Sequence, residues 1–255
     1  MSTVVESAAL AGRALREIPR LPTRVVFPIL VPILQLVLFA AVFDRVARLP
    51  GYGAGSSLDF LAPSMVAFAV AIGSGGAGFQ LVRDIDAGFF DKLRAAPISR
   101  ASILLGLIAT DAVRLALQAL AVLLVALALG APQKTGVLGV LVVMGLAAGF
   151  GAAWSGIGLN VALLSRDAEI TAASNVFIFP LYFGSTAFMP ANLLPHWLRV
   201  ANHYNPVAYL IDAMRALMLH GWQTTPILDG FAAAAGFAAV TLPLALTAFR
   251  RAVRE

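Results

Sequence analysis

Cysteine is absent from the sequence, and charged residues are scarce. A chain without cysteine has no disulfide, no thiolate metal ligand and no catalytic thiol. Asp, Glu, Lys and Arg make up only 12% of the 255 residues, against about 25% in a typical soluble domain. The three histidines, His196, His203 and His220, are scattered along the chain, so no metal site is expected. These absences argue against thiol chemistry, a metal centre and a water-soluble fold.

Hydrophobic residues, in contrast, make up 60% of the chain and gather in long runs. A helix needs roughly 20 apolar residues to cross the hydrocarbon core of a bilayer. We count six such runs, at about residues 25–43, 60–82, 102–129, 136–164, 169–188 and 227–249. The first run starts late and lacks a cleavage site, which favours an uncleaved span over a signal peptide. The sequence therefore predicts an all-α integral membrane protein with six transmembrane helices.

The net charge of +5 comes from basic residues at the ends of these runs rather than in one stripe, which indicates membrane topology and not nucleic-acid binding. Six spans place both termini on one side. If that side is the cytoplasm, it carries twelve of the 18 Lys and Arg residues and the outer side five, with Arg114 inside a span. We therefore expect a multi-pass protein with both termini in the cytoplasm.

Residues 1–24 are too polar and too short to span a membrane. Read as a helix, they place Ala8, Leu15 and Ile18 on one face, with arginines largely away from it. This pattern favours an amphipathic helix that lies on the inner leaflet, and the alternative is a frayed polar leader. Residues 25–255 then form one six-span domain.

The charged segment at residues 83–100 lies between spans two and three, on the predicted cytoplasmic side. Read as a helix, it aligns Ile85, Phe89 and Leu93 on one face. A solvated loop that follows the positive-inside rule would explain the arginines but not the phenylalanines. A short amphipathic helix of this kind docks into a groove on a soluble partner.

The segment at residues 189–222, on the predicted outer side, is too polar for a normal span and too apolar for an exposed loop. Two short helices would explain it, at about residues 194–203 and 206–219, with Asn205-Pro206 as the break. We expect these helices to dip partway into the outer leaflet.

Two acidic–basic pairs at i, i+3 spacing are expected to form ion pairs. Asp212 and Arg215 lie in the outer segment, and Asp111 and Arg114 lie in span three. Charges inside a membrane are candidates for function. For Asp111, structural pairing near the inner interface is favoured over a role in a proton relay, because Arg114 neutralises it.

Two further patterns have more than one interpretation. Span five carries Phe179, Tyr182 and Phe183, which either pack against lipid and core or line a substrate path. The run "GSGGAG" at residues 73–78 lacks the GxxxxGK[ST] pattern of a phosphate-binding loop, as does the whole chain. We therefore attribute these glycines to close helix packing.

Two stretches together resemble type-2 ABC exporter permeases. The stretch "RDIDAGFFDKLRAAPISRASILLG" is similar to that family's segment between spans two and three, through Gly88, Leu93, Pro97, Ser99, Arg100, Ile103, Leu104 and Gly106. The stretch "FMPANLLPHWLRVANHYNPVAYLIDAMRALML" resembles its second signature, through Pro190, Leu194, Pro195, Trp197, Leu198, Asn205, Pro206, Tyr209, Asp212 and Arg215. The sequences of the two stretches are most similar to those of the daunorubicin-resistance-like drug-export permeases. The family often has Glu where this chain has Asp84 and Asp86.

The resemblance implies a coupling helix at about residues 84–96 that docks into a separately encoded ABC ATPase. The residues expected in this contact are Asp84, Asp86, Gly88, Phe89, Phe90, Leu93, Arg94 and Pro97. It also implies an outer re-entrant motif at about residues 190–220, made by Asn205, Pro206, Tyr209, Asp212 and Arg215. Two ATPase copies would pair with two permeases, the second being a copy or a homologue, within membrane lipid. ATP and Mg would bind only to the ATPase, so this chain is not itself an enzyme.

The resemblance favours export of a hydrophobic, amphipathic or lipid-like compound of the drug type across a bacterial cell membrane. Two alternatives remain open: a polysaccharide- or glycolipid-exporting ABC permease, and a proton-coupled secondary transporter that uses Asp111. A membrane-embedded hydrolase is disfavoured, because the sequence has no HExxH, no GxSxG and no paired intramembrane carboxylates.

Overall fold

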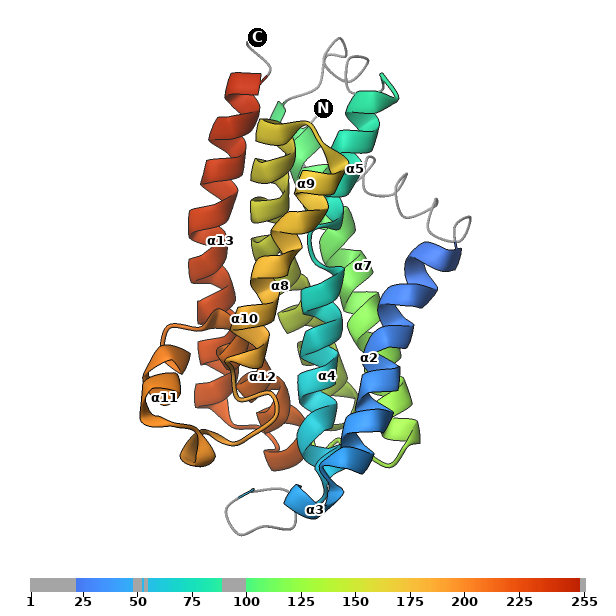
Figure 1. Ribbon diagram of the computed structural model, residues 1–255, viewed down its shortest axis with the longest axis vertical. Helices are drawn as coiled ribbons and strands as arrows, with labels where there is room; N and C mark the ends of the chain where they lie inside the picture. Colours follow the sequence, from blue (N-terminus) through green and yellow to red (C-terminus); the bar gives the residue numbers. More distant parts are fainter. Residues whose placement is uncertain (1–21, 48–51, 53–54, 89–99, 253–255) are drawn as a thin grey trace.

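The computed structural model describes residues 22–47, 52, 55–88 and 100–252, and within these residues it is a bundle of helices without strands (Figure 1). The α-helices are α2 (Pro22–Val42), α3 (Asp44–Ala47), α4 (Ser57–Gly73), α5 (Gly76–Asp86), α7 (Arg100–Ala128), α8 (Gly136–Ser165), α9 (Ala168–Ala173), α10 (Ile178–Phe183), α11 (His196–Asn202), α12 (Pro206–Arg215) and α13 (Thr224–Ala252). Short turns of 3-10 helix, η2 (Ser174–Phe177) and η3 (Ala191–Leu193), and one π turn, η4 (Ala216–His220), join them. The helix predicted at the N-terminus lies outside the described residues, apart from the start of α2.

Four helical stretches are long and apolar enough to cross a membrane: Ser57–Asp86, Ser102–Ala128, Gly136–Ser165 and Thr224–Phe249. They match the predicted spans two, three, four and six. The runs predicted as spans one and five form shorter apolar helices among the described residues, at Ile29–Val42 and Ala168–Phe183. The helical, membrane-spanning class is thus confirmed, with four clear spans.

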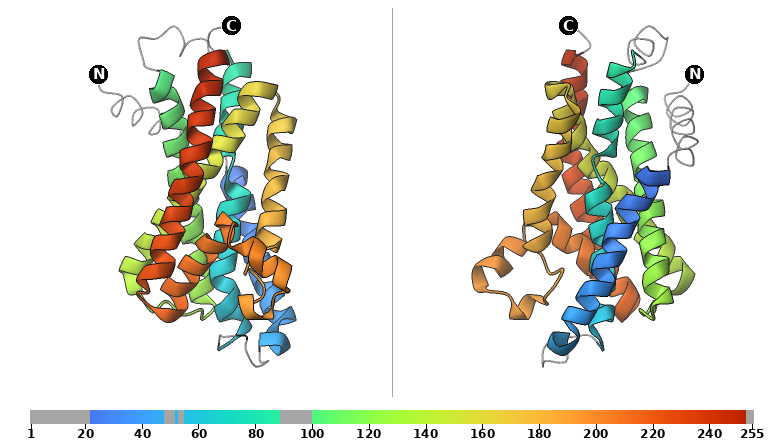
Figure 2. Two further views of the ribbon diagram at one scale, coloured as in Figure 1. Left: turned by 90° about the vertical axis from the view of Figure 1, so that its left-hand side faces the viewer. Right: turned by 45° about the vertical axis from the view of Figure 1, so that its right-hand side comes forward.

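Helix α4 occupies the centre of the bundle, where α2, α7 and α12 pack around it (Figures 1 and 2). Almost all of its side chains are buried, as expected of a helix that is apolar on every side. Helix α13 lies at the periphery and leaves Leu228, Val240 and Leu244 more than half exposed. An apolar surface of this kind is suited to contact with lipid.

The outer segment forms the two short helices that the sequence predicts, α11 and α12. Pro206 occupies the start of α12, and the Asn205 side chain accepts a hydrogen bond from the Val207 N–H at 3.0 Å. Asn205 also donates to the Leu181 carbonyl at 2.6 Å, which ties this break to α10. Helix α11 projects sideways from the bundle, whereas α12 and the buried turn η4 return into it (Figures 1 and 2).

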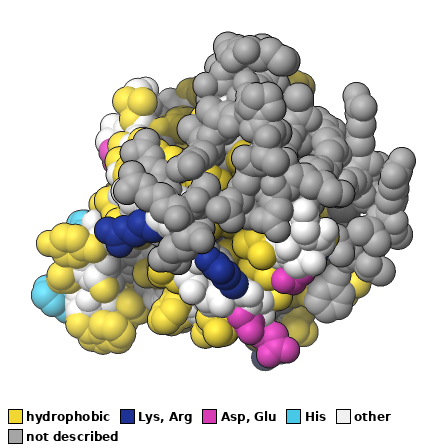
Figure 3. Space-filling view, turned by 90° about the horizontal axis from the view of Figure 1, so that it is seen from above, with side chains coloured by type: hydrophobic (Ala, Val, Ile, Leu, Met, Phe, Trp, Pro, Cys, Tyr) yellow, Lys and Arg dark blue, Asp and Glu magenta, His cyan; other side chains and the backbone are white. Residues whose placement is uncertain are grey.

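The end of the bundle that carries the end of α5 and the start of α7 also carries the end of α13 (Figure 1). Seen from this end, it displays both basic and acidic side chains beside hydrophobic ones (Figure 3). Arg166, Asp167 and Glu169, at the turn from α8 to α9, are exposed there. We call this the inner end, following the predicted topology.

Candidate functional site

Span two is interrupted near its middle, although the predicted span at residues 60–82 carries no charged residue. Helix α4 ends at Gly73 and α5 begins at Gly76. Between them Gly75 has a φ of +95°, a left-handed conformation that glycine adopts without steric cost. Such a break frees backbone groups from their helical partners, and inside a membrane each unpaired group costs several kcal/mol. We call residues 73–76 the joint.

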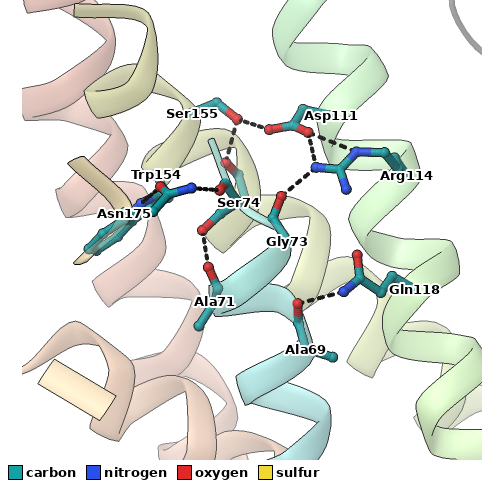
Figure 4. Close-up of polar contacts among 11 residues, drawn as sticks. Ala69, Ala71, Gly73, Ser74, Asp111, Arg114, Gln118, Trp154, Ser155 and Asn175 are labelled. Atoms are coloured by element: carbon teal, nitrogen blue, oxygen red, sulfur yellow. Dashed lines mark hydrogen bonds and ion pairs between the residues drawn. The ribbon is translucent and has the colours of Figure 1, made fainter. Parts of the chain in front are cut away.

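Side chains from other helices satisfy the carbonyls that the break frees (Figure 4). Arg114 on α7 donates from Nη2 to the Gly73 carbonyl at 2.5 Å. Asn175 on η2 donates from Nδ2 to the Ser74 carbonyl at 2.9 Å. The Ser74 hydroxyl adds a bond to the Ala71 carbonyl at 2.6 Å. The joint is therefore a specific structure, held from α7 and from the segment before α10.

Arg114 and Asp111 form the ion pair that their spacing predicts. The guanidinium donates from Nε to Asp111 Oδ1 at 3.1 Å and also from Nη2 to the same oxygen. The carboxylate is only 2% exposed, and the Ser155 hydroxyl on α8 donates to its Oδ2 at 2.6 Å. At 1.5 Å per residue, Asp111 lies about 14 Å from the start of the span Ser102–Ala128. The pair is thus well inside the bundle and joins α7 to α8.

The cation of the ion pair complements the helix end of α4 at the joint. The C-terminus of a helix carries a partial negative charge and the N-terminus a partial positive charge. Arg114 donates to the last carbonyl of α4, at Gly73. The start of α5 lies against both members of the pair, because a Cβ built on Gly76 would be 2.6 Å from Arg114 Nη2 and 2.6 Å from Asp111 Oδ1. The cation therefore meets the negative end of α4, whereas both charges lie beside the start of α5.

The glycines of the "GSGGAG" run allow close approach at the joint. A Cβ on Gly78 would lie 2.5 Å from the Gly158 carbonyl oxygen, so α5 and α8 meet backbone to backbone. A Cβ on Gly75 would lie 2.6 Å from Asn175 Oδ1. Close packing was predicted for this run and is confirmed, but the break was not predicted. The signal was present, since each glycine costs a helix about 1 kcal/mol relative to alanine.

Three members of this network were missed by the sequence analysis: Ser155, Asn175 and Trp154. The Trp154 indole donates to Asn175 Oδ1 at 3.4 Å and so holds the amide from α8 (Figure 4). None of the three belongs to a recognisable motif. Their only signal is a polar group inside an apolar run, which does not identify a partner.

A second polar cluster surrounds Arg215 near the outer end of the bundle. Its Nη1 donates to Asp212 Oδ1 at 2.9 Å, which is the second predicted ion pair. Its Nη2 donates to the Thr186 carbonyl at 2.8 Å and to Ser64 Oγ at 3.1 Å. The guanidinium also lies 4.0 Å above the Phe60 ring. Arg215 thereby joins α12 to α4 and to the segment after α10.

The three aromatic residues singled out in span five, Phe179, Tyr182 and Phe183, do not share one environment. Phe179 and Phe183 are 40% and 51% exposed, and their rings stack with centroids 6.2 Å apart. Tyr182 is buried, and its hydroxyl donates to the Ser64 carbonyl at 3.0 Å. Tyr182 therefore packs in the interior beside the Arg215 cluster, and only the two phenylalanines present a surface. Tyr209, of the outer motif, donates to the His203 carbonyl at 2.9 Å.

A family model described as ABC-2 type transporter matches residues 6–219. The chain belongs to this family. Curated relatives include the daunorubicin resistance ABC transporter permease protein DrrB1 of Streptomyces coeruleorubidus, 27% identical over 93% of this chain and 83% of the relative. The protein named Probable doxorubicin resistance ABC transporter permease protein DrrC of Mycobacterium tuberculosis is 26% identical over 98% of this chain and 90% of its own. The transport permease ycf38 of Cyanophora paradoxa is 29% identical over 85% of this chain and 75% of the relative.

The structure of this ABC-2 family member describes only the first part of the predicted coupling helix. Asp84 and Asp86 lie in the last turn of α5, which leads directly from the joint. The chain leaves the helix at Gly88, whose φ is +62° and whose N–H donates to the Ile85 carbonyl. The residues expected to contact the ATPase beyond this point lie outside the described residues: Phe89, Phe90, Leu93, Arg94 and Pro97.

The start of the coupling segment belongs to α5. Residues 84–86 are helical as the last turn of α5, and the helix expected at residues 84–96 stays a prediction beyond residue 88. Ile85 belongs to α5 and packs against the buried residues at the inner end of the bundle. A left-handed glycine after the last helical turn is a common helix stop, which explains the boundary at Gly88.

Proposed function

We propose that this ABC-2 permease exports hydrophobic, amphipathic or lipid-like compounds of the drug type from the cytoplasm or inner leaflet of a bacterial cell membrane. The observation that carries this proposal is the match to permeases named for daunorubicin and doxorubicin resistance over nearly the whole of both chains. The broad apolar surface and the few charged residues of the spans suit a substrate of this kind.

The proposed arrangement has six spans, with α2 as the first and α9 to α10 as the fifth. Helix α2 has 21 residues, enough for about 32 Å at 1.5 Å per residue. Helices α11 and α12 would form the re-entrant pair at the outer leaflet, and both termini would be cytoplasmic. Residues 1–24 would lie on the inner leaflet as an amphipathic helix.

Two copies of this chain, or one copy and a homologue, would assemble with two ABC ATPase subunits. ATP and Mg would bind to the ATPase, and the segment that follows α5 would dock into it through Phe89 and Leu93. Its position supports this role, because α5 continues from the buried joint to the inner end, where the segment begins. A displacement of the segment would thus act on the centre of the bundle.

A proton-coupled secondary transporter is the main alternative from another class, with Asp111 as its proton-binding group. The environment of Asp111 disfavours this role. Its carboxylate accepts hydrogen bonds from Arg114 and Ser155. Protonation would leave the Arg114 cation without its counter-charge inside the bundle, which is energetically costly. A polysaccharide or glycolipid substrate remains compatible with the exposed Phe179 and Phe183.

The test is reconstitution with the ATPase. The chain is co-expressed with candidate ABC ATPases, purified in mild detergent and assayed in vesicles for ATP hydrolysis and uptake of a fluorescent anthracycline. We expect a stable complex with ATP-dependent uptake, and loss of coupling in Leu93→Asp. Leu138→Asp, on an exposed outer position of α8, is the matched control. Uptake that needs a proton gradient but no ATPase would contradict the proposal. Uptake of glycolipid but not of drug would replace the proposed drug-type substrate by a glycolipid.

A further inference from the structure

The joint in span two also separates two hydrophobic cores. The outer core surrounds α4 and includes Leu61, Phe68 and Trp154. The inner core is a separate cluster that consists of Ala77, Leu81, Val82, Ile103, Leu104, Leu159, Ala162, Leu163, Ala245 and Phe249. Within span two, α4 contributes only to the outer core and α5 only to the inner core.

The two halves of span two accordingly have different neighbours. Helix α4 packs mainly against α2, α7 and α12, whereas α5 packs mainly against α8, with smaller contacts to α7 and α9 (Figures 1 and 2). An uninterrupted helix of 30 residues would carry a displacement of its inner end through to its outer end. A break allows the inner half to change direction while the outer half stays in place.

We propose that the joint is a hinge at which α5 tilts against α4 during the transport cycle, and that Asn175 is the positioning residue that sets its angle. This inference rests on the proposed function, because the force on α5 would come from the ATPase. Gly75 supplies the backbone freedom, since its φ of +95° is open to few other residues. Hinges of this kind are a few residues that absorb the φ/ψ change.

The contacts at the joint suit a hinge better than a static kink. The carbonyls of Gly73 and Ser74 are paired with side chains rather than with backbone groups. Side chains can follow a moving carbonyl, so the freed groups stay satisfied while the angle changes. Gly78, four residues after Ser74, contacts the backbone of Gly158 and holds α5 against α8. This contact would act as the pivot on which α5 tilts.

The first test compares two glycine-to-alanine variants. Gly75→Ala adds a Cβ that meets the Asn175 amide and strains a left-handed residue. Gly130→Ala is the matched control, because Gly130 has a φ of +102° but no atom within 4 Å of a built Cβ. We expect transport per ATP hydrolysed to fall about tenfold in Gly75→Ala, within the usual range of coupling between sites, and to change little in Gly130→Ala. Equal ratios in both variants would overturn the hinge.

The second test measures the motion itself and does not depend on a joint variant that folds. Since the chain has no cysteine, introduced pairs can be spin-labelled without background. One pair is Ala87, after α5, with Leu138 on α8, and the control pair is Leu164 with Leu138, both on α8. Labelled permease is diluted with unlabelled permease in the ATPase complex, and distances are compared with and without bound ATP.

We expect ATP to change the Ala87–Leu138 distance and to leave the Leu164–Leu138 distance as it was. Asn175→Leu, which removes the bond to the Ser74 carbonyl, should broaden the first distance without ATP. A complex that transports with ATP but keeps the Ala87–Leu138 distance fixed would overturn the hinge and leave the proposed function intact. A chain that transports without any ATPase would refute the proposed function as well.

Discussion

Two ion pairs in the described part of the chain have the same i, i+3 spacing but different roles. Asp111 and Arg114 lie on one helix but act on another, because the guanidinium donates to the last carbonyl of α4. Asp212 and Arg215 also share a helix, and there Arg215 bridges to Ser64 and Thr186. The two acidic side chains differ in exposure: the Asp111 side chain is 2% exposed and the Asp212 side chain 48%. The anion of the inner pair therefore depends on its partner far more than that of the outer pair.

The largest effect is expected at the inner pair. Arg114→Ala leaves the buried Asp111 carboxylate without a counter-charge and the Gly73 carbonyl without its donor. Breaking a buried pair in this way costs about 3–5 kcal/mol, so we expect a large fall in the free energy of unfolding in detergent. The double variant Asp111→Ala/Arg114→Ala should regain part of the loss. A single variant as stable as wild type would show that the joint does not need the ion pair.

The spans and the outer helices were accessible from the sequence because they depend on local patterns. Apolar runs predict spans, and Asn205-Pro206 predicts the start of α12, which both the cap and the proline enforce. The joint was not accessible in the same way. Gly75 signals a weak helix, but whether a weak helix breaks depends on the groups that can take up its carbonyls. Those groups, Arg114 and Asn175, come from distant parts of the chain.

The same distinction applies to the candidate site residues. Spacing predicted that Asp111 would meet Arg114, since i, i+3 positions lie on one face of a helix. It did not predict Ser155, because the register between α7 and α8 is set by packing. Tyr182 and Phe183 are neighbours in sequence, and only the tertiary structure buries the first and exposes the second.

Removing the outer cation should have the second largest effect. Arg215→Ala loses hydrogen bonds to Ser64 and to the Thr186 carbonyl, and its contact with the Phe60 ring. Asp212 is only half buried, so the cost comes mainly from the lost charged hydrogen bonds and is about 2–3 kcal/mol. Thermal unfolding in detergent measures it, with Arg199→Ala on the exposed face of α11 as the control. A loss as large as that of Arg114→Ala would refute the contrast between the two pairs.

A smaller effect is expected from Ser155→Ala. This change removes one donor to the buried Asp111 carboxylate while Arg114 stays in place. One charged hydrogen bond of this kind contributes about 1.5–3 kcal/mol, and we expect the lower end because the ion pair persists. Ser165→Ala is the control, since that hydroxyl bonds only backbone groups near the end of α8: the carbonyls of Val161 and Asp167 and the N–H of Asp167. If both variants unfold alike, Ser155 does not stabilise the carboxylate.

The smallest effect is expected at the outer anion, where the comparison is sharpest. Asp212→Asn replaces a half-exposed carboxylate by an amide that can still accept from Arg215 and Thr186. Because the Asp212 side chain is half exposed and the amide oxygen keeps both hydrogen bonds, we expect a cost close to the value of about 1 kcal/mol or less that is typical of exposed ion pairs. Asp111→Asn should cost clearly more, since the buried carboxylate accepts from Arg114 on Oδ1 and from Ser155 on Oδ2, and an amide offers only one acceptor oxygen in that enclosed site. Equal losses of unfolding free energy in the two Asp→Asn variants would mean that burial does not distinguish the pairs. A larger loss in Asp111→Asn would show that the ion pair at the joint contributes more to stability than the outer pair.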